Sequence, residues 1–150
     1  MTIRRADFPL PDTTDPVLAP FFEAAVRGEL VIPRCGTCGA WCWYPRERCR
    51  ECEADAFAWA PVRGTGSLFS WAVVRRPFLP AFADQVPFTA GLVAIDEDPS
   101  VRLVTTVVDA DPAELVAGQR MQVTFRALSF TTVPDRRVAV PMFRPAGPIA

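Results

Sequence analysis

Four cysteines carry the clearest chemistry in this sequence of 150 residues. They form two C-x-x-C pairs, Cys35 with Cys38 and Cys49 with Cys52, and ten residues separate the pairs. Each pair places two sulfurs on one tight turn, and the intervening segment lets the second turn fold back over the first. Four thiolates in a tetrahedron suit Zn²⁺, which has no redox chemistry of its own. We therefore expect a closed structural zinc site with no open position for metal catalysis.

A metal site accounts for the cysteine pairs better than disulfides or redox chemistry, although the identity of the metal stays open. Disulfides need an oxidising compartment, and the first residues run into Pro9 and Pro11 without the apolar segment of a signal peptide. A thioredoxin-like motif accounts for one C-x-x-C pair but not for two at this spacing. Iron in a rubredoxin-like site remains the alternative to zinc. The fifth cysteine, Cys42, lies between Trp41 and Trp43 and is expected to be a packed or semi-exposed thiol and not a ligand.

The composition removes most catalytic chemistry. The chain has no histidine, all 16 basic residues are arginine, and the formal net charge is −1. The commonest general base, the commonest catalytic metal ligand and amine chemistry are therefore missing. No global basic field attracts nucleic acid, and no apolar run approaches the roughly 20 residues of a membrane span. We expect a cytoplasmic protein without enzymatic activity of its own.

The first two regions of the chain position the cysteines. Residues 1–29 predict an extended arm and a short helix, which has a proline in its first turn, an apolar stripe and a cap at Gly28. Residues 30–56 predict the ribbon that holds the metal. In it, a strand at residues 30–32 leads into the first cysteine turn, and residues 41–44 are the expected returning strand.

The third region, residues 57–150, contains strands separated by tight turns. The proline and glutamate that follow Asp111 predict one helical turn, which ends at Gly118. Five strands with a helical turn between the third and the fourth favour an OB-type barrel over a sandwich, and an open SH3-like barrel is the main rival. The expected fold is mainly β: an N-terminal helix, a rubredoxin-like zinc ribbon and a C-terminal five-stranded OB-fold barrel with an extended tail. The strands are expected at residues 67–75, 88–95, 101–108, 121–128 and 137–143.

The order of these features resembles the acyl-CoA-associated zinc-ribbon/OB-fold proteins, long described as a domain of unknown function (DUF35). The matching segments are a phenylalanine-rich helix before Gly28, the two cysteine pairs with a Tyr-Pro-Arg step between them, and a barrel strand that follows Gly64. The resemblance covers about residues 16–128. One departure is Glu53, which follows the second pair where glycine is common.

The resemblance implies an accessory role. Members of this family act beside thiolase-fold enzymes (thiolases or aldolases) or MaoC-like hydratases in lipid and steroid side-chain degradation, where they bind acyl-CoA and stabilise the catalytic subunit. The chain would then be one subunit of a hetero-oligomer whose partner supplies the catalytic residues. The alternative, suggested by the ribbon and the barrel alone, is a module that binds single-stranded nucleic acid.

The loop from Arg75 to Phe82 is the expected contact with acyl-CoA or with the partner. Arg75 and Arg76 could bind the phosphates of coenzyme A through their guanidinium forks. Phe78 and Phe82, in a proline-stiffened segment, could contact an acyl chain or a partner surface. Trp71, on the preceding strand, belongs to the same expected contact. A solvated arginine pair and two core phenylalanines are the simpler interpretation.

Three further groups also have a simple and a functional interpretation. Phe21 and Phe22, on the predicted helix, could pack on a partner subunit or on the chain's own core. The acidic run at residues 96–98 is expected to be a solvated turn. An aromatic and basic cluster on the ribbon could stack nucleic acid bases, although packing of the ribbon against the barrel is expected. This cluster comprises Trp41, Trp43, Tyr44, Arg46 and Arg48.

Overall fold

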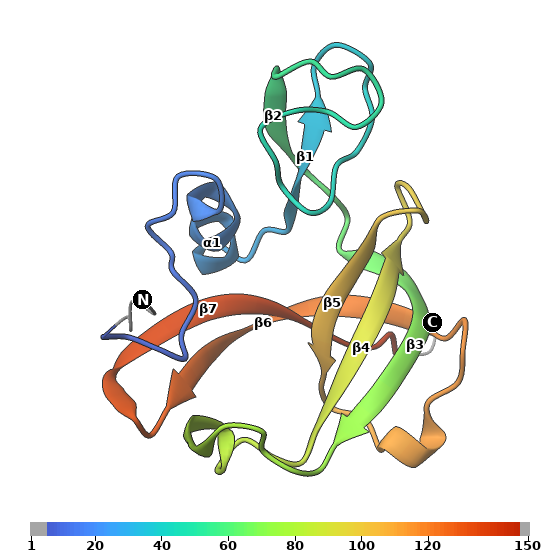
Figure 1. The fold of residues 1–150 in the computed structure, drawn as a ribbon. Helices are drawn as coiled ribbons and strands as arrows, with labels where there is room; N and C mark the ends of the chain where they lie inside the picture. The colour runs from blue at the N-terminus through green and yellow to red at the C-terminus, as the bar shows by residue number, and fades with distance from the viewer. Residues whose placement is uncertain (1–5, 148–150) are drawn as a thin grey trace.

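The computed structural model describes residues 6–147 of the chain. A short helix and a small two-stranded ribbon stand beside a five-stranded barrel (Figure 1). This mainly β architecture confirms the fold expected from the sequence. Within the described residues, no helix has both the length and the apolar character needed to cross a membrane.

Helix α1 (Ala19–Val26) begins and ends as its sequence predicts. Pro20 lies in the first turn, where a backbone N–H would have no helical acceptor. Gly28 follows the helix with a φ of 74°, a conformation that favours glycine, and stops the helix there. Ala24 and Ala25 are the buried residues of the helix, and their small side chains allow close packing.

The arm before the helix differs from the extended segment that the sequence suggested. The backbone N–H of Leu10 donates to the carbonyl oxygen of Asp7 over 2.9 Å, which makes a turn. Leu10 is fully buried and forms a small second core with Phe130 and Val138. The arm turns because this removes the leucine side chain from water, which an extended, solvated arm would not do.

The ribbon sheet consists of β1 (Val31–Cys35) and β2 (Phe57–Pro61), which pair antiparallel. The prediction that residues 41–44 form the returning strand is wrong, because Trp41 makes only an isolated bridge with Arg34. The residues between β1 and β2 form the two cysteine turns. The strand that pairs with β1 is therefore β2, which follows the second turn. The domain boundary after residue 56 stays a prediction, and β2 lies beyond it.

The closed barrel has the strand order β3-β4-β5-β7-β6, in which only the neighbours β5 and β7 are parallel. A short 3-10 turn at Pro80–Phe82 lies in the loop between β3 and β4. Another, at Pro112–Glu114, lies between β5 and β6 and is the predicted helical turn, with Asp111 as its cap. The strands are β3 (Thr65–Val74), β4 (Phe88–Ile95), β5 (Arg102–Val107), β6 (Arg120–Phe130) and β7 (Val133–Pro145).

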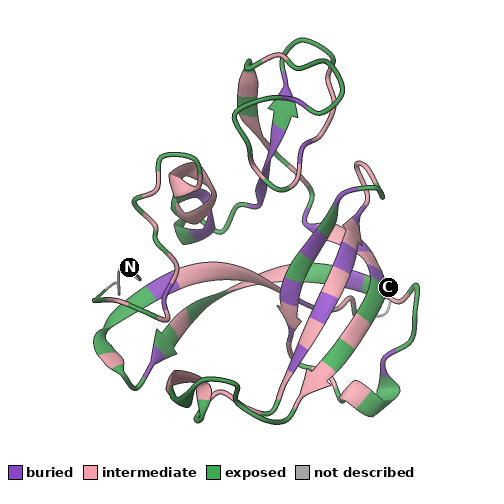
Figure 2. Ribbon diagram, viewed as in Figure 1, coloured by how far each residue is buried: buried purple, intermediate pink, exposed green. Residues whose placement is uncertain are grey.

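Side-chain alternation builds one core that the ribbon and the barrel share. Every second residue of β4, from Thr89 to Ile95, is buried (Figure 2), as expected for a strand with one face inside. Leu30 directly precedes β1 and Ile32 lies within it. Both side chains belong to the same core as the barrel side chains. The core consists of Leu30, Ile32, Leu68, Val93, Ile95, Val101, Leu103, Val107, Leu115, Met121 and Phe143.

The barrel is least firmly closed between β5 and β7. These strands share one residue pair, Val107 with Phe143, whereas β4 and β5 pair at six positions. A cavity of about 180 Å³ lies between the two strands, and Phe21 of α1 and Trp43 of the ribbon line it. Their rings lie 5.3 Å apart and pack against the core. The helix and the ribbon therefore cover this seam of the barrel.

Candidate functional site

The four predicted metal ligands come together at the far end of the ribbon. Their Sγ atoms all lie within 4.8 Å of one another. The distance is 3.7 Å from Cys35 to Cys52 and 3.7 Å from Cys38 to Cys49. Four sulfurs held about 2.3 Å from a central zinc lie roughly 3.8 Å apart, so the observed spacing fits a tetrahedral site. A full set of four thiolates leaves no coordination position for a substrate, and zinc here has a structural role.

Two similar turns place these sulfurs. In the first, the N–H of Cys35 donates to Ala40 O over 2.8 Å, and in the second the N–H of Cys49 donates to Ala54 O over 2.8 Å. The residue after each pair has a positive φ, which is 74° at Gly39 and 60° at Glu53. The second turn therefore adopts the glycine conformation without a glycine, which explains why Glu53 departs from the family pattern without disrupting the site.

The backbone around the buried cysteines favours thiolates. The N–H of Cys38 lowers the pKa of Cys35 to about 6, and the N–H of Cys52 lowers the pKa of Cys49. Burial instead raises the pKa of Cys42 to about 11, so this thiol stays neutral. Cys42 packs beside Cys35 and Cys49 and is not part of the four-sulfur cluster. The sequence prediction of a packed fifth thiol is confirmed.

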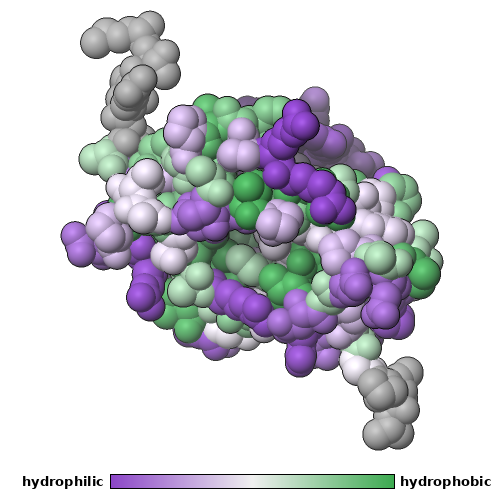
Figure 3. Space-filling model, turned by 90° about the horizontal axis from the view of Figure 1, so that it is seen from below, coloured by the Kyte–Doolittle hydropathy of each residue, from purple (hydrophilic) through white to green (hydrophobic). Residues whose placement is uncertain are grey.

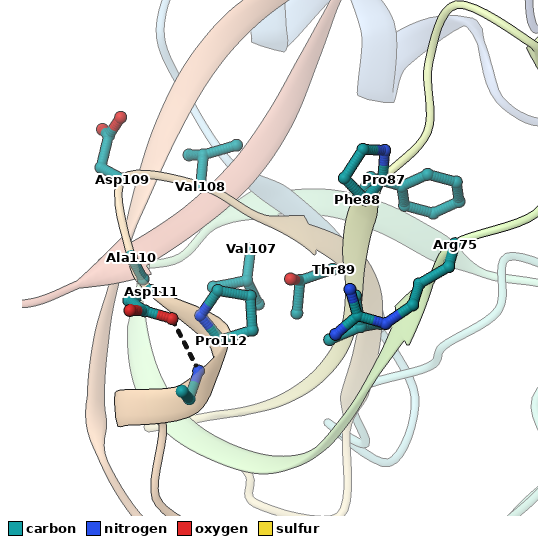
Figure 4. A pocket seen from close by; sticks show the side chains of 12 residues that line it. Arg75, Pro87, Phe88, Thr89, Val107, Val108, Asp109, Ala110, Asp111 and Pro112 are labelled. Carbon is teal, nitrogen blue, oxygen red and sulfur yellow. Dashed lines mark hydrogen bonds between the residues drawn. The ribbon is translucent and has the colours of Figure 1, made fainter.

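A second candidate site lies at the end of the barrel away from the ribbon. It is a cavity of about 450 Å³ between the end of β3, the start of β4 and the turn after β5. Arg75 and Thr89 face Asp111 and Pro112 across this cavity (Figure 4). Arg75 forms no ion pair with any residue between 6 and 147, so its guanidinium is available to an anion.

The two carboxylates of this cavity already have structural partners. Asp111 accepts a hydrogen bond from the N–H of Ala113 over 2.9 Å and so caps the 3-10 turn. Asp109 pairs with Arg126 at 2.5 Å. Neither carboxylate is positioned as a general base beside a nucleophile of this cavity. The sequence predicts the capping role of Asp111. It does not predict the cavity, because the walls of the cavity come from segments that are distant in the sequence.

The structure brings four of the predicted contact residues together. Arg75 lines the barrel-end cavity, while Arg76, Phe78 and Phe82 line an adjacent pocket of about 190 Å³ with an entirely apolar surface. Phe88 lines both and separates them. Phe78 is 94% exposed. Phe82 makes an edge-to-face contact with a ring of the second small core, so it also has a packing role.

The other three predicted contact residues pack inside the chain. Trp71 lies in β3 and contacts the main core. Phe21 packs on Trp43, and Phe22 packs against the second small core. These contacts account for all three side chains without a partner, and their contact with another subunit stays a prediction. The expected packing of the ribbon aromatics is also present, because Trp41 and Trp43 contact the main core.

Comparison with known sequences identifies both halves of the chain. Residues 22–58 match a family profile described as the ChsH2 rubredoxin-like zinc ribbon domain, and residues 59–126 match the ChsH2 C-terminal OB-fold domain. A probable enoyl-CoA hydratase alpha subunit from Thermomonospora curvata is 35% identical over 130 residues, which are 85% of this chain. The match spans only 37% of that relative. A DUF35 domain-containing scaffold protein from Methanocaldococcus jannaschii is 26% identical over 66% of this chain and 69% of its own.

Solved structures agree with these sequence matches. The Ltp2-ChsH2(DUF35) aldolase contains a chain that superposes with a TM-score of 0.72 and 30% identity, over 90% of this chain and 98% of that chain. A DUF35 protein from Sulfolobus solfataricus shares the fold, with a TM-score of 0.54 and 14% identity over 75% of this chain and 80% of its own. The protein therefore belongs to the DUF35 family, in which a rubredoxin-like zinc ribbon is joined to an OB-fold domain.

Proposed function

We propose that this chain is a non-catalytic accessory subunit that binds acyl-CoA and stabilises a thiolase-fold or MaoC-like catalytic partner. The names of its relatives support an accessory role, since they describe a scaffold protein, a hydratase subunit and a component of an aldolase. A structural zinc and a cavity without a nucleophile-base pair fit a subunit that leaves the chemistry to its partner. A role in lipid or steroid side-chain degradation and a cytoplasmic location remain predictions.

The observation that carries the ligand proposal is the pairing of two pockets around Phe88. The larger contains Arg75, which has no ion pair within residues 6–147, and suits a phosphorylated, polar part of a ligand. The smaller, beneath the exposed Phe78, has only apolar surface and suits an alkyl chain. Acyl-CoA combines both kinds of group in one molecule. Figure 3 views this side of the molecule, where apolar side chains lie in a hollow with polar side chains around it.

Calorimetry with a medium-chain acyl-CoA tests the ligand part of the proposal. We expect replacement of Arg75 and Arg76 by glutamine to weaken binding at least tenfold, because both guanidinium partners of the phosphates are lost. Arg144→Gln is the matched control, since Arg144 is exposed and unpaired within the described residues but lines neither pocket. Equal weakening in both variants would show a general charge effect and contradict the assigned site.

Co-purification tests the partner part. The chain is co-expressed with a thiolase-fold or MaoC-like protein encoded beside it, and the mixture is separated by size-exclusion chromatography. We expect one co-eluting complex, and we expect Phe78→Ser to weaken it because Phe78 is the most exposed large apolar side chain of the described residues. Absence of a complex with every such neighbour would sink the proposal.

A further inference from the structure

A third pocket lies between the ribbon and the turn that joins β4 to β5. It measures about 260 Å³. Ser100 and Val101 form its barrel side. The ribbon side consists of Trp41, Cys42, Trp43, Tyr44, Arg46, Arg50 and Glu51. The barrel-end cavity lies at the opposite end of the same two strands, where β4 begins and β5 ends. The eight residues of β4 that separate the two sites span about 26 Å at roughly 3.3 Å per residue.

The pocket has an accessible aromatic wall. The rings of Trp43 and Tyr44 lie 5.2 Å apart, and Tyr44 is 57% exposed although it is a large ring. Trp41 carries the guanidinium of Arg34 at 5.0 Å from its ring centroid, so one of its faces is already covered. Tyr44 is therefore the ring most open to a planar ligand, and stacking on an aromatic side chain is how proteins bind a base without reading its sequence.

Two cations of the pocket have no partner among the described residues. Arg46 and Arg50 are exposed, and neither forms a hydrogen bond or an ion pair with another residue of the described range 6–147. Glu51 is the only carboxylate in the lining. Two guanidinium groups suit a phosphate, which they can bind in a bidentate manner. The single carboxylate can accept a hydrogen bond from a ribose hydroxyl or a base amine.

Trp43 contributes its ring to two neighbouring cavities. Nε1 of Trp43 is buried and has no hydrogen-bond partner among the described residues. Trp43 forms the wall between this pocket and the cavity at the barrel seam. Buried polar groups of folded proteins are nearly always paired with protein, water or ligand. This nitrogen is closed to solvent, so Trp43 contributes the rest of its ring to the lining of the pocket.

We propose that this pocket binds an adenine mononucleotide, with the base against Tyr44 and the phosphate between Arg46 and Arg50. A volume of about 260 Å³ is below the 300–1,000 Å³ usual for drug-sized ligands, which favours one nucleotide over a dinucleotide or a strand. The nucleotide can be free or can be the nucleotide end of coenzyme A. The pocket shares no residue with the barrel-end cavity, so failure of acyl-CoA binding at that cavity would leave this proposal standing.

The test uses the zinc-loaded full chain and NMR of its four tryptophan indole N–H groups. AMP, ADP, 3′,5′-ADP, coenzyme A, adenosine and inorganic phosphate are titrated separately. We expect AMP to move the Trp43 resonance, assigned with Trp43→Phe, while the resonances of Trp59 and Trp71 stay in place. Adenosine and phosphate should bind at least tenfold more weakly than AMP, because each makes only half of the contacts.

Tighter binding of 3′,5′-ADP than of AMP would assign coenzyme A as the source of the nucleotide. Tighter binding of AMP than of 3′,5′-ADP would assign a free nucleotide.

Variants supply the second arm of the test. Arg46→Gln with Arg50→Gln should weaken AMP binding at least tenfold at unchanged zinc content, and Arg46→Gln alone should give part of this loss. Arg48→Gln is the matched control and should stay within twofold, because Arg48 is exposed on the same segment but does not line the pocket. Replacement of Arg75 and Arg76 should leave AMP binding intact. An unmoved Trp43 resonance at millimolar AMP, or phosphate binding as tight as AMP binding, would overturn the proposal.

Discussion

At the scale of single residues, Asp96 links three strands of the barrel. Two nitrogens of Arg120 donate to its carboxylate over 2.7 and 2.6 Å, and the hydroxyl of Thr65 donates over 2.5 Å. Asp96 follows β4, while Thr65 begins β3 and Arg120 begins β6. The hydrogen bonds from Arg120, and then from Thr65, hold the pKa of Asp96 well below its usual range. The acidic run is a turn, as expected, but this carboxylate is an anchor and not merely a solvated group.

Asp96→Asn should therefore lower stability in a pH-dependent way. A depressed pKa in the folded state means that the carboxylate stabilises the fold above the unfolded pKa of about 4, and that this contribution is lost as pH falls through the folded value. Because Arg120 is about half exposed, solvent screening limits the expected loss to about 1 kcal/mol at neutral pH. Urea unfolding at pH 7, 5 and 3 measures it, with the exposed Asp135→Asn as control. A difference that grows as the pH falls would contradict the assignment.

At Glu53, a substitution is expected to raise stability and not to lower it. Its φ of 60° costs a non-glycine residue about 1–2 kcal/mol, and glycine removes that cost while adding up to about 1 kcal/mol of unfolded-state entropy. Glu53→Gly should therefore raise the free energy of unfolding of the zinc-loaded chain by about 0.5–1 kcal/mol. Gly39→Ala, at the matching place in the first turn, should lower it. Thermal unfolding of both variants compares them, and a destabilised Glu53→Gly would show that the glutamate side chain has an unseen role.

At the scale of elements, the barrel depends on close contact between β3 and β4. Gly66 pairs with Ile95 in this register, next to a shift between Leu68 and Ser70. A Cβ atom built on Gly66 would overlap the carbonyl oxygen of Ala94 and lie 2.9 Å from Val93 Cγ1. The backbone of β4 cannot retreat without disturbing the core behind it. The glycine is thus required by packing, since its φ is not positive.

Gly66→Ala should lower stability by about 1–3 kcal/mol, the usual range for overpacking a well-filled core. Chemical denaturation gives the value. Gly147→Ala is the control, because a Cβ there meets no atom within 4 Å. A Gly66→Ala variant as stable as the control would mean that the two strands can separate without cost.

At the scale of the whole molecule, zinc and the barrel are coupled through the shared core. The metal fixes the ribbon turns, the ribbon places Trp43, and Trp43 with Phe21 covers the seam between β5 and β7. Leu30 and Ile32 extend the same coupling from β1 into the barrel core. Loss of the metal should therefore reach beyond the cysteines, because the seam has only one strand pair of its own.

Cys38→Ser should remove the zinc and unfold the ribbon. Hydrogen exchange should show lost protection in β1 and β2 and along β5 and β7, whereas the pairing of β3 with β4 should keep most of its protection. Metal analysis checks the zinc content. Cys42→Ser is the control, since Cys42 lies outside the four-sulfur cluster, and it should retain one zinc per chain. Full zinc content in Cys38→Ser would contradict the four-thiolate site.

The molecule as a whole should not bind single-stranded nucleic acid. Its net charge is −1, and two of the three ribbon aromatics at residues 41–44, Trp41 and Trp43, pack against the core. Proteins that track a strand need both a basic groove and several open rings. Fluorescence anisotropy with labelled single-stranded DNA and RNA at low salt should detect no micromolar binding. Micromolar affinity that falls steeply with salt would revive the nucleic-acid alternative.

The metal site and the barrel could be predicted because their signals are local. Two C-x-x-C pairs define four ligands whatever surrounds them, and a proline with a capping aspartate marks the 3-10 turn before Gly118. The partner of β1 was misplaced because strand pairing depends on how the cysteine turns use the chain between them. The turn that buries Leu10 had no local signal, since its two buried core partners, Phe130 and Val138, lie more than a hundred residues away.

The sequence by itself determined the zinc ligands, the mainly β fold and the absence of histidine and lysine chemistry, because residue types and short spacings carry that information. Only the tertiary structure decided which exposed residues share a pocket. Arg75 lines one cavity with Thr89 and Asp111 at one end of the barrel. Tyr44 lines another with Arg46 and the β4–β5 turn at the other end. These meetings depend on strand order and on the closure of the barrel, and no local pattern encodes contacts between segments so far apart in the chain.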